Sequence, residues 1–270
     1  MQGTWSVIRH KSLSLHTYIA PEEGWLVTSH IIEFSSQLFI VDAQYTLPFA
    51  REVTHYAESL EKPLTRLFVT HYHPDHLLGA AVFDVPLYAL SFVADKIAAA
   101  GDRVASEEHE KVGNDIPDHA RRVDRRIEEG EEIIDGVRIV YRRLCSAETE
   151  DALVIALPDA SAIIVQDLVY NQSHPFLGER AFDGWRTALR EHRALPYTTV
   201  LPGHGKSGGL ELYDHMLEYL DFAESALETA ADTASFRRKL VERFPDYGGI
   251  KVVDHQLRFL FRQAPAIKYA

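Results

Sequence analysis

A short segment of this chain places three histidines and one aspartate within six positions: His71, His73, Asp75 and His76. Imidazole and carboxylate groups together are suitable ligands for zinc, iron or manganese. His71 and His73 are two residues apart, so in an extended segment their side chains leave the backbone on the same side. The two imidazoles can therefore bind one ion together.

The second half of the segment predicts a second ion. Asp75 and His76 are adjacent, so their side chains diverge unless the chain turns, and Pro74 favours a turn there. A loop of this kind can offer two residues to one ion and two to another, as in hydrolases that hold two metal ions a few ångströms apart. The spacing therefore indicates a dinuclear site.

An apolar run precedes this segment, and similar apolar runs precede three other residues that could bind a metal ion or support a ligand. Residues 67–69 lead to His71, residues 162–165 to Asp167, residues 198–201 to His204, and residues 38–41 to Asp42. Short, continuously apolar runs with β-branched residues are typical of strands buried on both faces. Because such sheets commonly carry function on the loops that follow their strands, we expect these side chains to meet at one edge.

These residues, in this order, resemble the metallo-β-lactamase superfamily of metal-dependent hydrolases over roughly residues 15–210. The segment that begins at His71 matches the family's His-x-His-x-Asp-His signature without a gap. The resemblance implies that Asp167 bridges two metal ions and that His204, in a Pro-Gly-His-Gly segment, is the last ligand. It also implies that Asp42 lies just outside the ligand set and supports it.

One position departs from the family pattern. The family usually supplies a histidine between the first motif and the bridging aspartate, whereas residues 145–151 contain none. Glu148 precedes a threonine there, so we expect it to replace the histidine, an exchange similar to that in the alkylsulfatase branch. Glu150 and Asp151 are the alternative ligands. The remaining alternative is that Glu148 is a solvated loop residue of an incomplete site.

The cofactor expected from this ligand set is a pair of divalent transition-metal ions. One ion is assigned to His71, His73 and Glu148, and the other to Asp75, His76 and His204, with Asp167 between them. Three carboxylates and a bridging hydroxide would make the metal core formally neutral, which suits harder metals as well as softer ones. Zinc is therefore the first expectation, with manganese or iron as alternatives.

The reaction that the resemblance implies is hydrolysis of a small ester-like substrate by a hydroxide held between the metals. The substrate would be a carboxylic ester, a lactone, a sulfate ester or a phosphate ester. Asp75 would orient or deprotonate the nucleophile as well as bind metal, while Tyr72, Tyr170, His174 and Phe176 either contact the substrate or only pack. An iron-dependent oxidoreductase of the same superfamily and a catalytically silent metal-binding protein are the alternative functions.

Composition narrows the range of partners. Forty acidic residues against 28 basic ones give a formal charge of −12, which opposes binding to nucleic acid. No stretch of 18 apolar residues and no signal-peptide pattern occur, and the single cysteine, Cys145, excludes an internal disulfide. We therefore expect a cytoplasmic enzyme that acts on a small molecule away from membranes, with Cys145 as a small core residue.

The expected fold is a four-layer αββα sandwich of the α/β (α+β) class over residues 1–207. Strands are predicted near residues 16–19, 26–34, 37–41, 86–90, 137–143, 153–157 and 162–165, and helices near residues 47–60, 92–100 and 181–192. The polar segment 101–124 is predicted to be a mobile insertion near the site.

Residues 208–270 contain three amphipathic patterns at helical spacing and no strand pattern, so they predict a helical C-terminal extension on the same domain. Three roles are compatible with this extension: a cap on the sandwich, a wall of the substrate cleft, or the interface of a homodimer.

Overall fold

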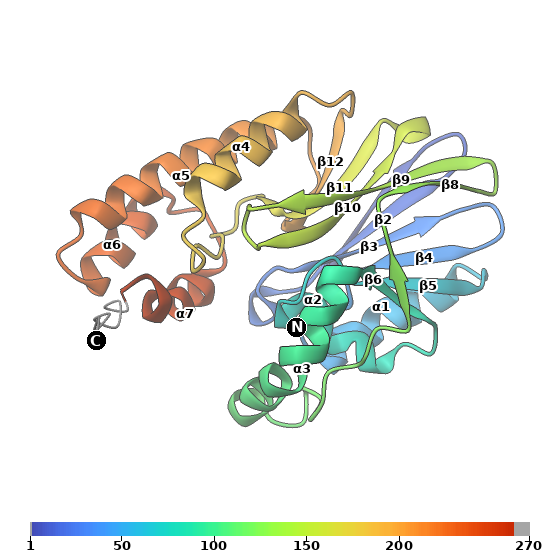
Figure 1. The fold of residues 1–270 in the computed structure, drawn as a ribbon, viewed down its shortest axis with the longest axis horizontal. Coiled ribbons are helices and arrows are strands. Elements are labelled where there is room, and N and C mark those ends of the chain that lie inside the picture. The colour runs from blue at the N-terminus through green and yellow to red at the C-terminus, as the bar shows by residue number, and fades with distance from the viewer. Residues whose placement is uncertain (1, 262–270) are drawn as a thin grey trace, which may run out of the picture.

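The computed structural model describes residues 2–261, which form two sheets with helices on both sides (Figure 1). The strands are β1 Thr4–Arg9, β2 Ser14–Ile19, β3 Thr28–Glu33, β4 Leu38–Val41, β5 Leu64–Phe68, β6 Leu87–Leu90, β7 Arg125–Ile127, β8 Gly130–Ile134, β9 Val137–Cys145, β10 Asp151–Leu157, β11 Ala162–Tyr170 and β12 Thr199–His204. The helices are α1 Leu47–Ser59, α2 Pro74–Leu77, α3 Ser91–Val112, α4 Phe182–Arg193, α5 Glu211–Thr229, α6 Thr233–Arg243 and α7 Ile250–Leu260, with short 3₁₀ turns η1 Glu22–Gly24, η2 Leu78–Val82 and η3 Pro158–Ala160.

Strand order explains why distant loops meet. The first sheet runs β1-β2-β3-β4-β5-β6-β7 and the second runs β12-β11-β10-β9-β8. β4 and β5 are parallel, and Val41 pairs with Phe68, so the loops that begin at Asp42 and Val69 start next to each other. β11 and β12 are also parallel, and Tyr170 pairs with His204. The carboxyl ends of these strands therefore present their loops at one edge of the sandwich.

Apolar side chains fill the space between the sheets and cover the outer face of the second sheet. Every residue of β4, β10 and β11 is buried, as expected for strands whose two faces are both covered. A second apolar cluster joins β10–β12 to α4–α7 through residues such as Trp185, Leu220, Phe236 and Val253. The expected αββα sandwich class is therefore confirmed, with α4 and α5 against the second sheet and the other two helices beyond it, α6 next to α5 and α7 next to α6 (Figure 1).

The segment after residue 100 differs from expectation. The prediction of a mobile insertion was wrong for residues 101–112, because α3 continues without interruption to Val112. The predicted location near the site agrees with the residues of α3 that line the cavity described below. Gly101, Ala105 and Glu108 continue the buried face of α3 at helical spacing. Two of these residues are small and one is charged, so this part of the sequence shows only a weak apolar pattern at helical spacing. Glu108 tolerates burial because it accepts a hydrogen bond of 2.6 Å from the Tyr45 hydroxyl.

Two smaller features also differ from expectation. β1, β7 and β8 were not anticipated, and they are strands without a fully buried residue. Cys145 is exposed rather than part of the core. Leu144 points inward near the end of β9, so the side chain of the next residue points outward.

The extension forms the three helices that its periodicity predicts, α5, α6 and α7. Residues 262–270, the last part of the expected extension, lie outside the described residues. Among residues 2–261, no helix combines the length and apolar character needed to cross a membrane.

Candidate metal centre

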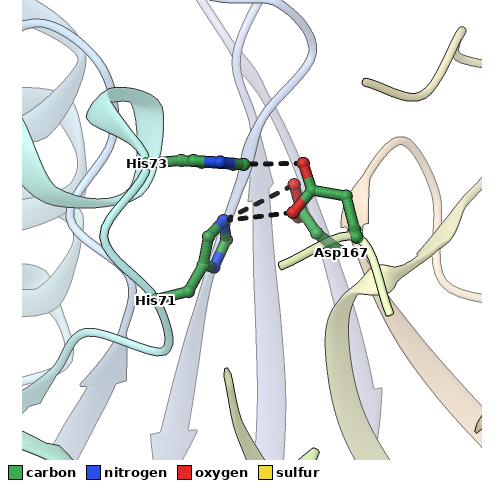
Figure 2. Close-up of side chains that lie close together, drawn as sticks. His71, His73 and Asp167 are labelled. Carbon is green, nitrogen blue, oxygen red and sulfur yellow. Dashed lines mark ion pairs between the residues drawn. The ribbon is translucent and has the colours of Figure 1, made fainter. Parts of the chain in front are cut away.

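All seven expected ligands converge at the edge where the parallel strands end. The loop after β5 carries His71 and His73, α2 carries Asp75 and His76, the turn between β9 and β10 carries Glu148, and β11 and β12 carry Asp167 and His204. Figure 2 shows His71, His73 and Asp167 pointing toward one another across the gap between the two sheets. Residues almost 130 positions apart thus share one site because the two sheets face each other.

The predicted turn at Pro74 separates the two halves of the motif. His73 has an extended backbone, with φ −65° and ψ 146°, and α2 starts at Pro74. Proline is favourable at the first helical position because its fixed φ suits the helix and its missing N–H is not needed. Asp75 and His76 then lie on a helical turn, which directs them to a different part of the site from His71 and His73.

The first group of ligand atoms comes from His71, His73, Glu148 and Asp167, and all four atoms lie within 4.8 Å of one another. His73 Nδ1 is 3.1 Å from Glu148 Oε1. His71 Nε2 is 3.9 Å from Glu148 Oε2 and 3.8 Å from Asp167 Oδ2. Atoms that bind one ion at about 2 Å lie roughly 3–4 Å apart, so this group has the dimensions of a metal site.

The second group comes from Asp75, His76 and His204. Asp75 Oδ2 is 3.6 Å from His76 Nε2 and 3.3 Å from His204 Nε2. Asp167 also reaches this group, because its Oδ1 is 3.1 Å from His76 Nε2 and its Oδ2 is 3.4 Å from His204 Nε2. Asp167 therefore lies between the two groups, where a bridging carboxylate is expected.

The buried polar atoms of the site fit a pair of cations. Six of them make no hydrogen bond with any described residue: His71 Nε2, His76 Nε2, His204 Nε2, Glu148 Oε1, Glu148 Oε2 and Asp167 Oδ1. Leaving a buried polar atom unsatisfied costs about 1–3 kcal/mol, and more when the group is charged. A cation in each group would contact all six atoms, so the donor set matches the metals that the motif predicts.

The electrostatics of the site also favour bound cations. Burial, together with the nearby His76, lowers the pKa of His71 well below its ordinary value, so its imidazole is neutral and can donate a lone pair. Burial raises the pKa of Glu148 to about 7, although the charge of His73 opposes this. Metal binding displaces protons from such groups because the ligating forms are the deprotonated ones.

Asp42 fixes one histidine from behind the site. It is fully buried, and its Oδ2 accepts hydrogen bonds of 2.7 Å from His76 Nδ1 and 2.7 Å from Thr70 Oγ1. Its Oδ1 accepts one of 2.7 Å from the Thr70 backbone N–H. Although burial opposes it, the carboxylates of Asp167, Asp75 and Asp42 raise the pKa of His76 well above its ordinary value. With its Nδ1 proton held by Asp42, His76 would offer Nε2 to a metal ion that displaces the second proton, the arrangement common around metal-binding histidines.

Three further residues that the sequence analysis missed support the ligands. Thr70 Oγ1, which donates to Asp42, accepts a hydrogen bond of 3.0 Å from His71 Nδ1, and the backbone oxygen of Trp25 accepts one of 2.8 Å from His204 Nδ1. Gln166 donates to Asp42 at 2.5 Å. Thr70 and Gln166 each directly precede a proposed ligand, so their positions in the sequence could have suggested a supporting role. Trp25 is 179 positions from His204, so the sequence gives no sign of its role.

The two alternatives to Glu148 have other partners. Glu150 is exposed, and its Oε2 is 3.1 Å from Lys96 Nζ. Asp151 binds the Arg143 guanidinium with both carboxylate oxygens. Only Glu148, which is 2% exposed, lies within the ligand group.

A cavity of about 430 Å³ opens onto the metal centre. Two of the expected substrate contacts, Tyr72 and Tyr170, line it, and so does Phe176. The described residues that line the cavity do not include His174. His174 is fully buried instead, with its Nδ1 2.8 Å from the Tyr219 hydroxyl, so its position does not support a contact with substrate.

We therefore expect His174→Ala to affect folding rather than catalysis. The variant loses the contact with the Tyr219 hydroxyl and leaves that hydroxyl buried, which should lower the free energy of unfolding by about 1–3 kcal/mol. Denaturant unfolding measures this loss, and steady-state kinetics at a temperature where the variant is folded should give a KM close to that of the wild type. A large increase in KM with unchanged stability would instead assign His174 to the substrate site.

Comparisons with known proteins all identify similarity to metallo-beta-lactamases. A family model described as the metallo-beta-lactamase superfamily matches residues 23–204. A metallo-beta-lactamase from Pontibacter korlensis has 21% sequence identity and a TM-score of 0.61, and the match covers 81% of this chain and 99% of that one. The FIM-1 metallo-beta-lactamase from Pseudomonas aeruginosa, solved in a mono-zinc form, has 18% identity and a TM-score of 0.60, with 82% and 96% of the two chains covered. At these identities the structural similarity concerns the fold, and α5–α7 lie after the residues that the family model matches.

Proposed function

The chain belongs to the metallo-β-lactamase superfamily, and we propose that it is a metal-dependent hydrolase that uses two divalent ions to cleave a small ester-like substrate. The observation that supports this most directly is the set of six buried ligand atoms without hydrogen bonds, arranged in two groups around Asp167. The cavity of about 430 Å³ that reaches this centre is within the usual size range for small-molecule sites.

We propose that each group holds one ion. One is held by His71, His73 and Glu148, the other by Asp75, His76 and His204, and Asp167 bridges them. Zinc is the first candidate, with manganese or iron as alternatives, because three carboxylates accompany four imidazoles. When bound, the ions would supply Lewis acidity and lower the pKa of a coordinated water.

Glu148 as a ligand is supported by its environment. Both of its carboxylate oxygens are buried without a hydrogen bond to any residue that the structure describes, and one lies 3.1 Å from His73 Nδ1. An ionised carboxylate in such a place requires a counter-charge. The tight turn from Ser146 to Glu150, closed by a hydrogen bond of 3.0 Å between the Ser146 N–H and the Glu150 carbonyl, directs Glu148 toward the site.

Two side chains of the cavity would have separate roles in the reaction: Asp75 would act on the attacking water, and Tyr170 would support the bridging carboxylate. Asp75 lines the cavity and belongs to the second ligand group, so its carboxylate would orient that water. Although burial opposes it, the two histidines of this group hold the pKa of Asp75 below its ordinary value, so the carboxylate stays ionised for this role. Tyr170 donates a hydrogen bond of 2.5 Å to Asp167 Oδ2, and its ring stacks on His204 at 4.4 Å between centroids. Tyr170 would thereby hold the bridging carboxylate in position and exclude water from that side. Contact of Tyr72 with the substrate remains a prediction, as does a homodimer through the extension.

The proposed function predicts both a metal content and a reaction. Elemental analysis of protein purified without chelator should approach about two transition-metal ions per chain. A panel of carboxylic esters, lactones, sulfate esters and phosphodiesters should contain a substrate. Chelation should abolish its hydrolysis, and added metal should restore it.

Other outcomes would distinguish the alternatives. A metal content that saturates near one ion per chain would contradict the dinuclear assignment. Fully loaded protein that hydrolyses nothing in the panel would contradict the hydrolase proposal. In that case, oxidation of a thiol by the iron-loaded form would favour the oxidoreductase function. Inactivity in both assays would favour a catalytically silent metal-binding protein.

A further inference from the structure

One wall of the cavity comes from outside the part of the chain that the family model matches. Residues of both α3 and α7 line the cavity. α7 contributes Val252, His255 and Phe259 to its lining. The family match ends at residue 204, so this wall belongs to the extension rather than to the shared fold.

Aromatic rings connect α7 to the metal centre. The Phe176 ring meets the His73 ring edge to face at 5.5 Å between centroids, and meets the Phe259 ring in the same way at 5.5 Å. The Trp25 ring lies 5.7 Å from the His255 ring, and the Trp25 carbonyl accepts a hydrogen bond from His204. Aromatic rings therefore extend from His73 through Phe176 to α7, and Trp25 joins His204 to α7 through its carbonyl and its ring.

The position of α7 is fixed by hydrogen bonds at its start. The Glu22 carboxylate accepts hydrogen bonds of 2.8 Å from the Gly249 N–H and 3.2 Å from the Ile250 N–H. The Gly248 N–H donates to the Gln172 carbonyl at 3.0 Å. The carboxylate satisfies N–H groups at the helix start that have no partner within the helix. The aromatic wall is thus held in place before a substrate binds, which lowers the entropy cost of binding.

Polar groups on the α7 side of the cavity are paired with one another. Arg258 Nη2 lies 3.1 Å from His255 Nε2, and burial lowers the pKa of His255, so the neutral imidazole accepts this hydrogen bond. The Arg258 guanidinium lies 4.7 Å from the centre of the Phe259 ring. An exposed carboxylate, Glu179, also lines the cavity and would repel an anionic substrate group. Arg258 keeps its charge because His255 is neutral. The other described α7 residues of the lining, Val252, His255 and Phe259, offer an uncharged surface suited to an apolar group.

We propose that Phe176 and Phe259, with Trp25 and His255, form the pocket for a flat apolar group of the ester-like substrate, so that α7 determines specificity. This inference rests on the proposed hydrolase function. It assigns to the substrate an aryl or similarly apolar group on the acyl side of the scissile bond, placed between Phe176 and α7. A small acyl group such as acetyl would leave the aromatic wall uncovered.

The kinetic test compares methyl phenylacetate with methyl acetate, which differ by one ring and share a leaving group too small to occupy the pocket. The metal-loaded enzyme should prefer the phenylacetate by at least about tenfold in kcat/KM. Phe259→Ala should remove most of this preference, mainly through KM, and Phe176→Ala should do the same if Phe259→Ala does not fold. Phe222→Ala is the matched control, because Phe222 is partly buried in α5 against Phe244, and it should keep the wild-type preference.

Binding without turnover separates this inference from the proposed function. Calorimetry should show that phenylacetate binds the metal-loaded protein at least about tenfold more tightly than acetate, and that Phe259→Ala loses the difference. Hydrolysis of both esters with no preference would overturn the pocket and leave the hydrolase proposal intact. If the enzyme cleaved neither ester but still bound phenylacetate more tightly than acetate, the result would support the aromatic pocket and contradict the hydrolysis of such esters.

Discussion

Glu148→Ala should remove most of the activity and lower the metal content from about two ions per chain to about one. The substitution takes both carboxylate oxygens from the group that contains His71 and His73, so the ion held there would lose a ligand and its negative charge. Losing a residue that only supports a ligand typically costs 10–100-fold in metal affinity or activity, so losing a ligand should cost more than about 100-fold. Elemental analysis after dialysis and steady-state kinetics measure the two effects.

Two further substitutions at this position sharpen the test. Glu148→Gln keeps the size and one acceptor oxygen but removes the charge, so it should also weaken metal binding. Glu148→His should retain more metal and activity than Glu148→Ala, because imidazole is itself a good metal ligand. The control is Glu150→Ala, which removes only an exposed ion pair with Lys96 and should behave as the wild type. Full metal content and normal activity in Glu148→Ala would show that the ion does not depend on this residue.

The sequence could predict which side chains meet at the candidate metal centre because most of the relevant information is local. His71, His73, Asp75 and His76 lie in one short segment, and the turn at Pro74 that separates them follows from proline geometry alone. Asp167 and His204 follow apolar runs that indicate buried strands, and the structure buries nearly all of β11 and β12. Parallel pairing of these strands brings their ends together, so the meeting of distant loops also follows from the strand assignment.

The cavity could not be predicted in the same way. Its wall depends on where α7 lies relative to α3 and to the loop after β11, and no spacing within α7 carries that information. Trp25 joins the site through its backbone carbonyl, which any residue type possesses. His174 was expected there because it follows Asp167 closely, but the chain turns at the end of β11 and buries it against Tyr219. In each case the tertiary packing, rather than a local pattern, decides which side chains face the substrate.

The length of α3 shows a related limit. Its second half packs through Gly101, Ala105 and Glu108, residues that hydropathy ranks as neutral or polar. Gly101 is needed because a side-chain carbon there would approach the Ala120 side chain to 2.9 Å. Close packing of small residues and one hydrogen-bonded carboxylate thus supports a helix that an apolar pattern does not reveal.

Asp42→Asn should weaken both the fold and the metal site, although Asp42 belongs to neither proposed ligand group. The wild-type carboxylate accepts hydrogen bonds from Thr70, His76 and Gln166. In the asparagine variant one carboxylate oxygen becomes an NH₂ group, which is a donor. It would face another hydrogen-bond donor, so both groups would be buried without an acceptor. The free energy of unfolding of the metal-free protein should fall by about 3 kcal/mol, measured by denaturant titration.

Asp42→Asn should also reduce metal affinity by about 10–100-fold, for a separate reason. Without the carboxylate, His76 is no longer held with its proton on Nδ1, and the tautomer with the proton on Nε2 cannot bind metal through that atom. Ser29→Ala is the matched control. The Ser29 hydroxyl donates to the Asp42 backbone carbonyl at 2.7 Å and is also fully buried, so its loss should lower stability while metal affinity is unchanged. If Asp42→Asn and Ser29→Ala lost stability equally and both bound metal normally, Asp42 would act only in folding, and the orientation of His76 would have to come from the ligand group itself.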